Sequence, residues 1–179
     1  AEQGGVLLNY MEVTGLLNEN GEVAFIADLT ATSGGTADNS AIYFANGQPN
    51  GLNTVVREGQ AAPNGDGEFV AFDNNNFLLN DSSQIVFLSE LTNSATRGDI
   101  GIFFYNATEG LVTLARKGDA FLGSTIRDVS LGPNALNNGG QVVYGFELVD
   151  GRFGIALATI ADILLGDYNN NGIVDAADY

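Results

Sequence analysis

The residues best suited to chemistry lie near the C-terminal end, in the sequence Asp167-Tyr168-Asn169-Asn170-Asn171-Gly172-Ile173-Val174-Asp175-Ala176-Ala177-Asp178. Counted from Asp167, oxygen-bearing side chains fall at positions one, three, five, nine and twelve, and glycine falls at position six. Calcium takes about six to eight oxygen ligands, and a loop with this spacing can wrap them around the ion. The sequence therefore predicts a Ca²⁺ site. Its expected ligands are the side chains of Asp167, Asn169, Asn171, Asp175 and Asp178 and the backbone carbonyl of Ile173.

This loop resembles the calcium-binding half-repeat of dockerin domains, in which an aspartate commonly takes the last position, as Asp178 does here. The resemblance implies a calcium loop followed by a helix and usually by a second half-repeat. Only Tyr179 follows Asp178 in this sequence, so we expect residues 161–179 to bind the ion without forming a complete dockerin. The alternative interpretation is a polar, asparagine-rich tail.

Three other carboxylates, Asp28, Glu90 and Glu147, occupy the same place in three similar strands. Brought together, they could hold a metal ion or act as a general acid and base. We favour the alternative that each marks the solvated end of its strand and pairs with an arginine such as Arg57 or Arg116. Histidine and cysteine are absent, which removes the usual zinc, haem and iron–sulfur ligands and any histidine-activated nucleophile. We therefore expect no enzyme, although a hydrolase built on carboxylates alone would suit this composition.

The remaining signals concern partners and location. Asn80-Asp81-Ser82 and Asn106-Ala107-Thr108 match the acceptor pattern for N-glycans, a pattern that also arises by chance in an asparagine-rich chain. The chain has 22 acidic and 6 basic residues, a formal net charge of −16. This charge disfavours nucleic acid and anionic membranes, and it favours divalent cations or solubility outside the cell. No run approaches the ~18 apolar residues of a membrane span. We expect an extracellular or cell-surface protein.

The elements that must position these residues form a repeat. Leu-Asn, two variable residues, Gly or Ser, Glu or Gln and then a strand recur at Leu17, Leu79 and Leu136, which are 62 and 57 residues apart. Each round holds about four short strands, with apolar residues at a period of two and hairpin signals such as Asn46-Gly47. Residues 1–160 are thus expected to form an all-β domain of antiparallel sheets, built from about three four-strand repeats. The calcium loop of residues 161–179 would follow it.

Four antiparallel strands in each repeat suggest a propeller blade, but propellers typically close with ~4–8 blades. A sandwich, a barrel and an incomplete propeller completed by another copy all remain open. Residues 6–160 resemble a family of secreted bacterial tandem-repeat surface proteins, through Asn18, Gly21 and Phe25, through Gly101-Ile102-Phe103, and through Leu114-Ala115-Arg116-Lys117-Gly118. That resemblance implies an exported, propeller-like protein and supplies no active site.

These features together predict a non-enzymatic extracellular structural protein that is stabilised by calcium and assembles with itself. One route to a filament is strand addition, in which residues 6–10 of one copy complete the open edge of another. The alternative is a glycan-binding or protein-binding accessory module of an extracellular complex.

Overall fold

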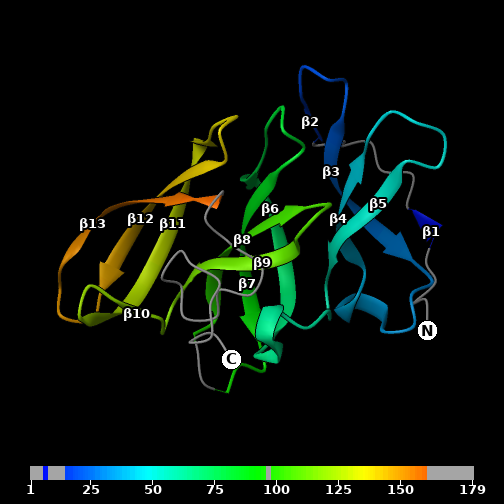
Figure 1. Cartoon of the computed structure of the whole chain (residues 1–179). Helices are drawn as coiled ribbons and strands as arrows, with labels where there is room; N and C mark the ends of the chain where they lie inside the picture. The colour runs from blue at the N-terminus through cyan, green and yellow to red at the C-terminus, as the bar shows by residue number, and fades with distance from the viewer. Residues whose placement is uncertain (1–5, 8–14, 96–97, 161–179) are drawn as a thin grey trace, which may run out of the picture.

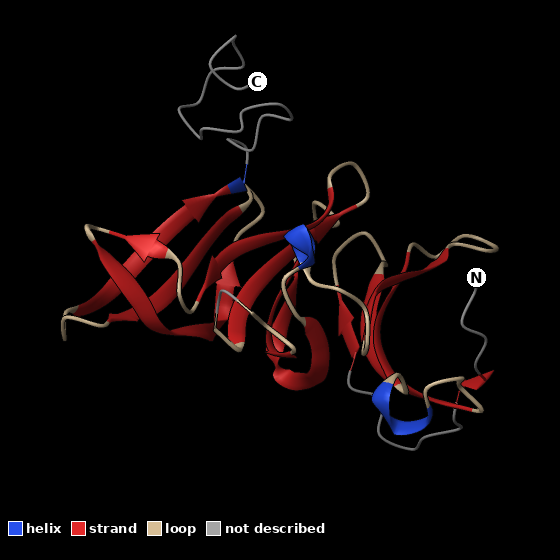
Figure 2. Ribbon diagram, turned by 90° about the horizontal axis from the view of Figure 1, so that it is seen from below, coloured by secondary structure: helices blue, strands red, loops and turns tan. Residues whose placement is uncertain are grey.

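The computed structural model of the chain describes residues 6–7, 15–95 and 98–160. These residues form three antiparallel β-sheets that lie one after another in a row (Figure 1). Figure 2, turned by 90° about the horizontal axis, shows the same open row, which does not close into a barrel. The predicted all-β class with antiparallel repeat sheets is confirmed. Within the described part of the chain, no helix is long and apolar enough to cross a membrane.

The three sheets share one design, in which four strands pair antiparallel in the order of the sequence; in the first sheet the short β1 and β2 both pair with β3. The first sheet contains β1 (Val6–Leu7), β2 (Gly15–Leu17), β3 (Val23–Thr30), β4 (Ser40–Ala45) and β5 (Leu52–Arg57). The second contains β6 (Glu68–Leu79), β7 (Ile85–Thr92), β8 (Ile100–Asn106) and β9 (Gly110–Arg116). The third contains β10 (Ala120–Phe121), β11 (Ser124–Leu136), β12 (Gln141–Leu148) and β13 (Phe153–Thr159). Two short 3-10 helices, η1 (Gly35–Ala37) and η2 (Pro63–Gly65), lie in the described loops.

Each sheet corresponds to one round of the sequence repeat. β3, β7 and β12 follow the Leu-Asn turns, and β4, β8 and β13 pair with them in the same register: Phe44 lies opposite Ala24, Phe104 opposite Val86, and Leu157 opposite Val143. The third sheet differs from the others at its edge. Within the described residues β13 pairs only with β12, whereas β4 and β8 each have a further neighbour, β5 and β9.

Two apolar cores lie between the sheets. The first is made by side chains of the first and second sheets, chiefly Ala24, Ile42, Phe44, Val56, Phe69, Ile85, Phe87 and Phe103. The second is made by the second and third sheets, chiefly Val86, Ile102, Phe104, Ile126, Val142, Tyr144 and Leu148. Because side chains alternate along a strand, β7 sends Phe87 to one core and Val86 to the other. The middle sheet is therefore covered on both faces.

Candidate functional site

The predicted calcium ligands Asp167, Asn169, Asn171, Ile173, Asp175 and Asp178 lie outside the described residues, so the calcium site stays a prediction. In residues 6–7, 15–95 and 98–160, no group of three or more Asp, Glu, His or Cys side chains is arranged to hold a metal ion.

The structure brings together two of the three strand carboxylates. Glu90 and Glu147 line one open groove between the second and third sheets, whereas Asp28 lies in β3 of the first sheet. The expected pairing with Arg57 or Arg116 is wrong, because those arginines bind loops of the protein instead. Glu147 accepts a hydrogen bond of 2.9 Å from Arg127, a residue of its neighbouring strand β11. The three carboxylates therefore do not form one site.

The groove that holds Glu90 and Glu147 is made of exposed ion pairs. Lys117 donates to Asp99 at 2.8 Å, and this hydrogen bond lowers the pKa of the Asp99 carboxyl. A general acid needs the opposite, a carboxyl whose pKa is raised toward the working pH. Asp99 is therefore poorly suited to act as a general acid.

The two predicted glycan acceptors have different surroundings. Asn80 is buried, and its Nδ2 donates to Gln84 at 2.6 Å and to the Asn137 carbonyl at 2.8 Å. A sugar on Asn80 would have to replace these hydrogen bonds. Asn106 is the last residue of β8, and its Oδ1 accepts from the N–H groups of Thr108 and Glu109 in the turn that follows. Glycosylation of Asn106 stays a prediction.

The Leu-Asn motif forms one turn three times. In each turn the asparagine Oδ1 accepts two backbone N–H groups, those of the residues two and four positions later; for Asn80 these distances are 3.0 and 2.9 Å. Its Nδ2 donates to the Glu or Gln side chain four positions later, at 2.6 Å in the case of Asn18 and Glu22. Asparagine side chains favour turns because they can satisfy backbone groups in this way. These contacts explain why each repeat has an Asn after the Leu and a Glu or Gln four positions after that Asn.

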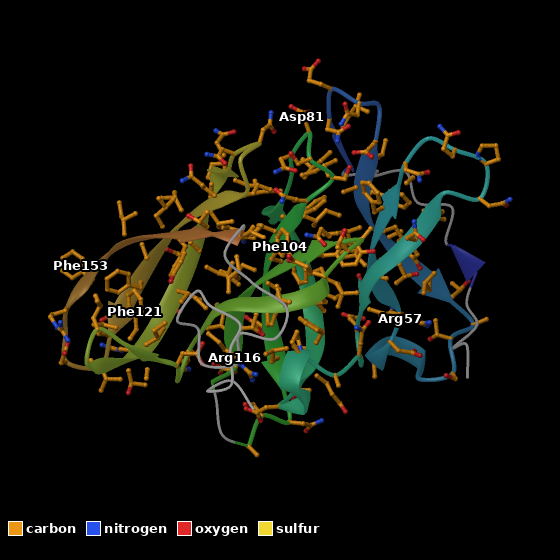
Figure 3. The ribbon with its side chains drawn as sticks, in the orientation of Figure 1. Arg57, Asp81, Phe104, Arg116, Phe121 and Phe153 are labelled. Atoms are coloured by element: carbon orange, nitrogen blue, oxygen red, sulfur yellow. The ribbon has the colours of Figure 1, made fainter. Side chains whose placement is uncertain are left out.

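The same asparagines join the three turns to one another. Asn18 Nδ2 donates to the carbonyl of Asn80 at 2.9 Å, and Asn80 Nδ2 donates to the carbonyl of Asn137 at 2.8 Å. We call this series of Asn18, Asn80 and Asn137 the asparagine ladder. It runs along one side of the row of sheets, across all three, where Asp81 is labelled in Figure 3. Each step of the ladder has the same direction, because the donor is always in the earlier turn.

A second set of bonds runs parallel to the ladder. The N–H of Glu19 donates to Asp81 Oδ1 at 2.8 Å, and the N–H of Asp81 donates to Asn138 Oδ1 at 3.0 Å. Here too the donor lies in the earlier turn and the acceptor in the later one. Two side-chain bonds between the same turns run the other way, from Asn138 Nδ2 to Asp81 Oδ2 at 2.6 Å and from Ser83 Oγ to Glu22 Oε2 at 2.7 Å, so the single direction is a property of the asparagine ladder. Within the described residues the ladder starts at the Asn18 carbonyl as its first acceptor and ends at Asn137 Nδ2 as its last donor.

Arginines tie the loops at the other side of the sheets. The side chain of Arg116 is fully buried; its Nε donates to the Gly98 carbonyl at 2.9 Å, Nη1 to the Asp66 carbonyl at 2.6 Å, and Nη2 to Ser94 Oγ at 2.9 Å. Arg57 holds the same place in the first round and binds the Asp38 carbonyl at 2.7 Å. Figure 3 labels both arginines well away from the ladder. The basic residue in the Arg-x-Gly part of the repeat therefore has a structural use.

Apolar side chains are exposed on the outer face of the third sheet. Ile155 and Leu157 in β13 are 79% and 61% exposed, although their equivalents in β8, Ile102 and Phe104, are fully buried against the third sheet. Phe153, labelled in Figure 3 at the outer edge of the molecule, is 83% exposed. We define the distal face as Val143, Phe153, Ile155 and Leu157. It is built like the faces that receive a further sheet, and none covers it here within the described residues.

At the opposite end of the row, in the first sheet, a leucine is exposed although its repeat equivalents are packed. Leu17 is 72% exposed, whereas its equivalents Leu79 and Leu136 pack against the first and second cores. Leu17 pairs with Val23, and Phe25 lies on the same face of the first sheet; both are half-buried. We define the proximal face as Leu17, Val23 and Phe25. It has the residue pattern that the second and third sheets turn toward the preceding sheet, but only its Leu17 end is exposed, because Leu29, Ala41 and Tyr43 on the same face form a buried cluster.

Sequence reasoning did not single out either face. Aligning the three rounds of the repeat shows that Ile155 and Leu157 match Ile102 and Phe104, but alignment does not show which of these positions is covered. Exposure depends on whether a further sheet follows. The ladder was missed for a similar reason, because its bonds join turns that are 57 and 62 residues apart.

The chain belongs to the family of unknown function DUF7453, whose profile matches residues 2–163. This match spans all three sheets. Searches among curated proteins and among solved structures give no match. The resemblances to dockerins and to secreted tandem-repeat proteins stay predictions.

Proposed function

We propose that the protein is a non-enzymatic, extracellular structural protein that assembles with itself into a linear array. The observation that supports this proposal is the distal face, where the repeat equivalents of interior side chains are exposed to solvent. Large contiguous apolar patches are uncommon on monomeric soluble proteins and mark interaction surfaces. Covering one such side chain completely contributes about 1.5–3 kcal/mol, from which the entropy cost of association must be subtracted.

Packing sheet on sheet suits the described chain better than strand addition does. Val6–Leu7, part of the segment predicted to complete another copy, pairs with Leu29 and Thr30 in its own first sheet. Strand addition would require this pairing to be exchanged. Packing on the distal face requires no such exchange.

The proposed assembly can be tested with a charged residue on the distal face. We expect Ile155→Lys to remain a monomer at protein concentrations where the wild type forms larger species, as measured by light scattering after size exclusion. The variant should fold normally because Ile155 is 79% exposed. Wild-type assembly should strengthen with added salt, because each copy has a net charge of −16 and salt screens the repulsion.

Val149→Lys provides the matched control. Val149 is 66% exposed and lies in the turn after β12, and its repeat equivalents Thr30 and Thr92 are exposed even where their sheets are covered. This variant should assemble like the wild type. A wild-type protein that stays monomeric at all accessible concentrations and salt levels would refute the proposed function.

We further propose that calcium stabilises the protein through the loop of residues 167–178. The support is the ligand spacing in the sequence, which gives five oxygen side chains and one glycine in calcium-loop register. Because an ion that binds only the folded state raises stability by mass action, EDTA should lower the Tm of the wild type. Asp167→Ala should have the low Tm with or without EDTA. An EDTA-independent Tm in the wild type would rule out calcium stabilisation.

A further inference from the structure

We infer that the distal face binds the proximal face of a second copy, in the register that continues the asparagine ladder from Asn137 to Asn18 of the next copy. This inference rests on the proposed self-assembly and specifies its partner surface and register. The resulting contact joins two different faces, so each added copy leaves one free face of each kind. A contact of this type gives a ring or an open filament rather than a closed pair.

The first argument is the direction of the two internal interfaces. In both, an earlier sheet offers the β4 or β8 side chains, such as Ile42 or Ile102, and the later sheet offers the β7 or β12 side chains, such as Phe87 or Tyr144. The distal face is of the first kind. At the other end of the row the face of the second kind is the proximal face, which is exposed at Leu17 and half-buried at Val23 and Phe25. The repeat thus pairs distal with proximal and does not pair distal with distal.

The second argument is the apolar match. Leu79 and Leu136, each the residue before a ladder asparagine, pack into the interface with the preceding sheet. Leu17 holds this position in the first round and is exposed. In the inferred contact Leu17 of the next copy takes the corresponding place against the distal face. Exposed apolar residues at both ends of the row are then covered by one contact.

The third argument is the state of the ladder at its two ends. Asn18 and Asn80 each use Nδ2 twice, once within the turn and once toward the next turn, whereas the bond from Asn137 Nδ2 in the described residues is to Gln141. The Asn18 carbonyl accepts the N–H of Gly21. A carbonyl has two lone pairs, and those of Asn80 and Asn137 each accept a second bond from the preceding turn. The last donor and the first acceptor are therefore complementary.

The residues next to the ladder are complementary in the same sense. Asp81 and Asn138 supply the side-chain oxygen that accepts an N–H from the preceding turn. Glu19 occupies this position in the first turn and has a carboxylate, so it can accept the N–H of Asn138 from another copy. Charge-assisted hydrogen bonds of this kind are shorter and stronger than neutral ones.

Mixing two blocked variants tests the pairing of the faces. Leu17→Lys blocks the proximal face, and Ile155→Lys blocks the distal face; both sites are exposed, so both variants should fold. Each variant alone is expected to be monomeric. An equimolar mixture should form a one-to-one heterodimer and nothing larger, because each partner retains one usable face. Sedimentation velocity and light scattering measure these masses.

A second pair of variants tests the register. Asn137→Asp keeps the Oδ1 acceptor of its turn and replaces the Nδ2 donor, so it should weaken assembly at least about tenfold. Asn53→Asp makes the same charge change at an exposed position in β5, away from both faces, and should assemble like the wild type. Equal assembly of the two variants would overturn the ladder register.

The outcomes separate this inference from the proposed function. If the wild type assembles and Leu17→Lys alone also assembles, the distal face pairs in another way, and the inference fails while self-assembly stands. Strand addition by residues 6–10 would give that result. If the wild type does not assemble at all, the proposed function fails first.

Discussion

Replacing Arg116 with methionine is expected to lower the free energy of unfolding by about 3–5 kcal/mol, the usual result of removing one partner from a buried ionic network. The guanidinium is fully buried and donates to two backbone carbonyls and one hydroxyl, from Gly98, Asp66 and Ser94. Methionine fills a similar volume but donates no hydrogen bond. These acceptors would then lose a buried donor, and Asp66 would lose the cation 3.9 Å from its carboxylate.

Urea denaturation of Arg116→Met beside Arg127→Met measures this effect. Arg127 is an exposed arginine that pairs with Glu147 at 2.9 Å, and exposed pairs contribute only about 0–1 kcal/mol. Both variants replace an arginine with methionine, so they differ only in the burial and the partners of the arginine that is removed. Similar losses in the two variants would show that the buried network of Arg116 does not stabilise the protein.

Asn80→Asp is expected to lower the free energy of unfolding by about 2–3 kcal/mol, because it leaves buried groups without their donor. The new oxygen would face Gln84 Oε1 and the Asn137 carbonyl, both acceptors that Nδ2 now serves at 2.6 and 2.8 Å. The Oδ1 bonds within the turn would remain. The middle position of the ladder is therefore expected to be the most sensitive of the three.

Two comparisons sharpen the Asn80→Asp measurement. Asn137→Asp changes an exposed member of the same ladder and should cost about 0.5–1 kcal/mol in the monomer. Burial should also raise the pKa of the new carboxyl above its unfolded value, so the folded state binds the extra proton more readily. Stability is then lost as pH rises through that pKa, and the penalty should be smaller at pH ~5 than at pH ~7. An equal cost at both ladder positions would contradict the role of burial.

The strands and turns were predictable because the contacts that form them are local. The period-two pattern places Val86 and Phe87 on opposite faces, and the Asn, the Gly or Ser, and the Glu or Gln of each turn lie within five residues of one another. The repeat predicted about three four-strand units, and each unit corresponds to one sheet. The predicted calcium loop also depends on local spacing, and it lies outside the described residues.

The contacts between residues of different repeats depended on the tertiary structure. Spacing in the sequence placed Asp28, Glu90 and Glu147 at equivalent positions, but equivalent positions in successive sheets are not neighbours by necessity, and Asp28 is in a different sheet from the groove. The pairing of Arg116 with Asp66 joins residues 50 positions apart, which no local pattern specifies.

The sequence by itself determined which side chains share a face, because alternation along a strand is a property of the backbone. Only the tertiary structure decided which faces are covered, since coverage depends on the neighbour that packs there. Ile102 and Ile155 illustrate this difference: they occupy the same repeat position, yet one is fully buried and the other is 79% exposed. The asparagine ladder follows the same rule, because its turns form locally but its direction and its two unlike ends arise only when the sheets lie in a row.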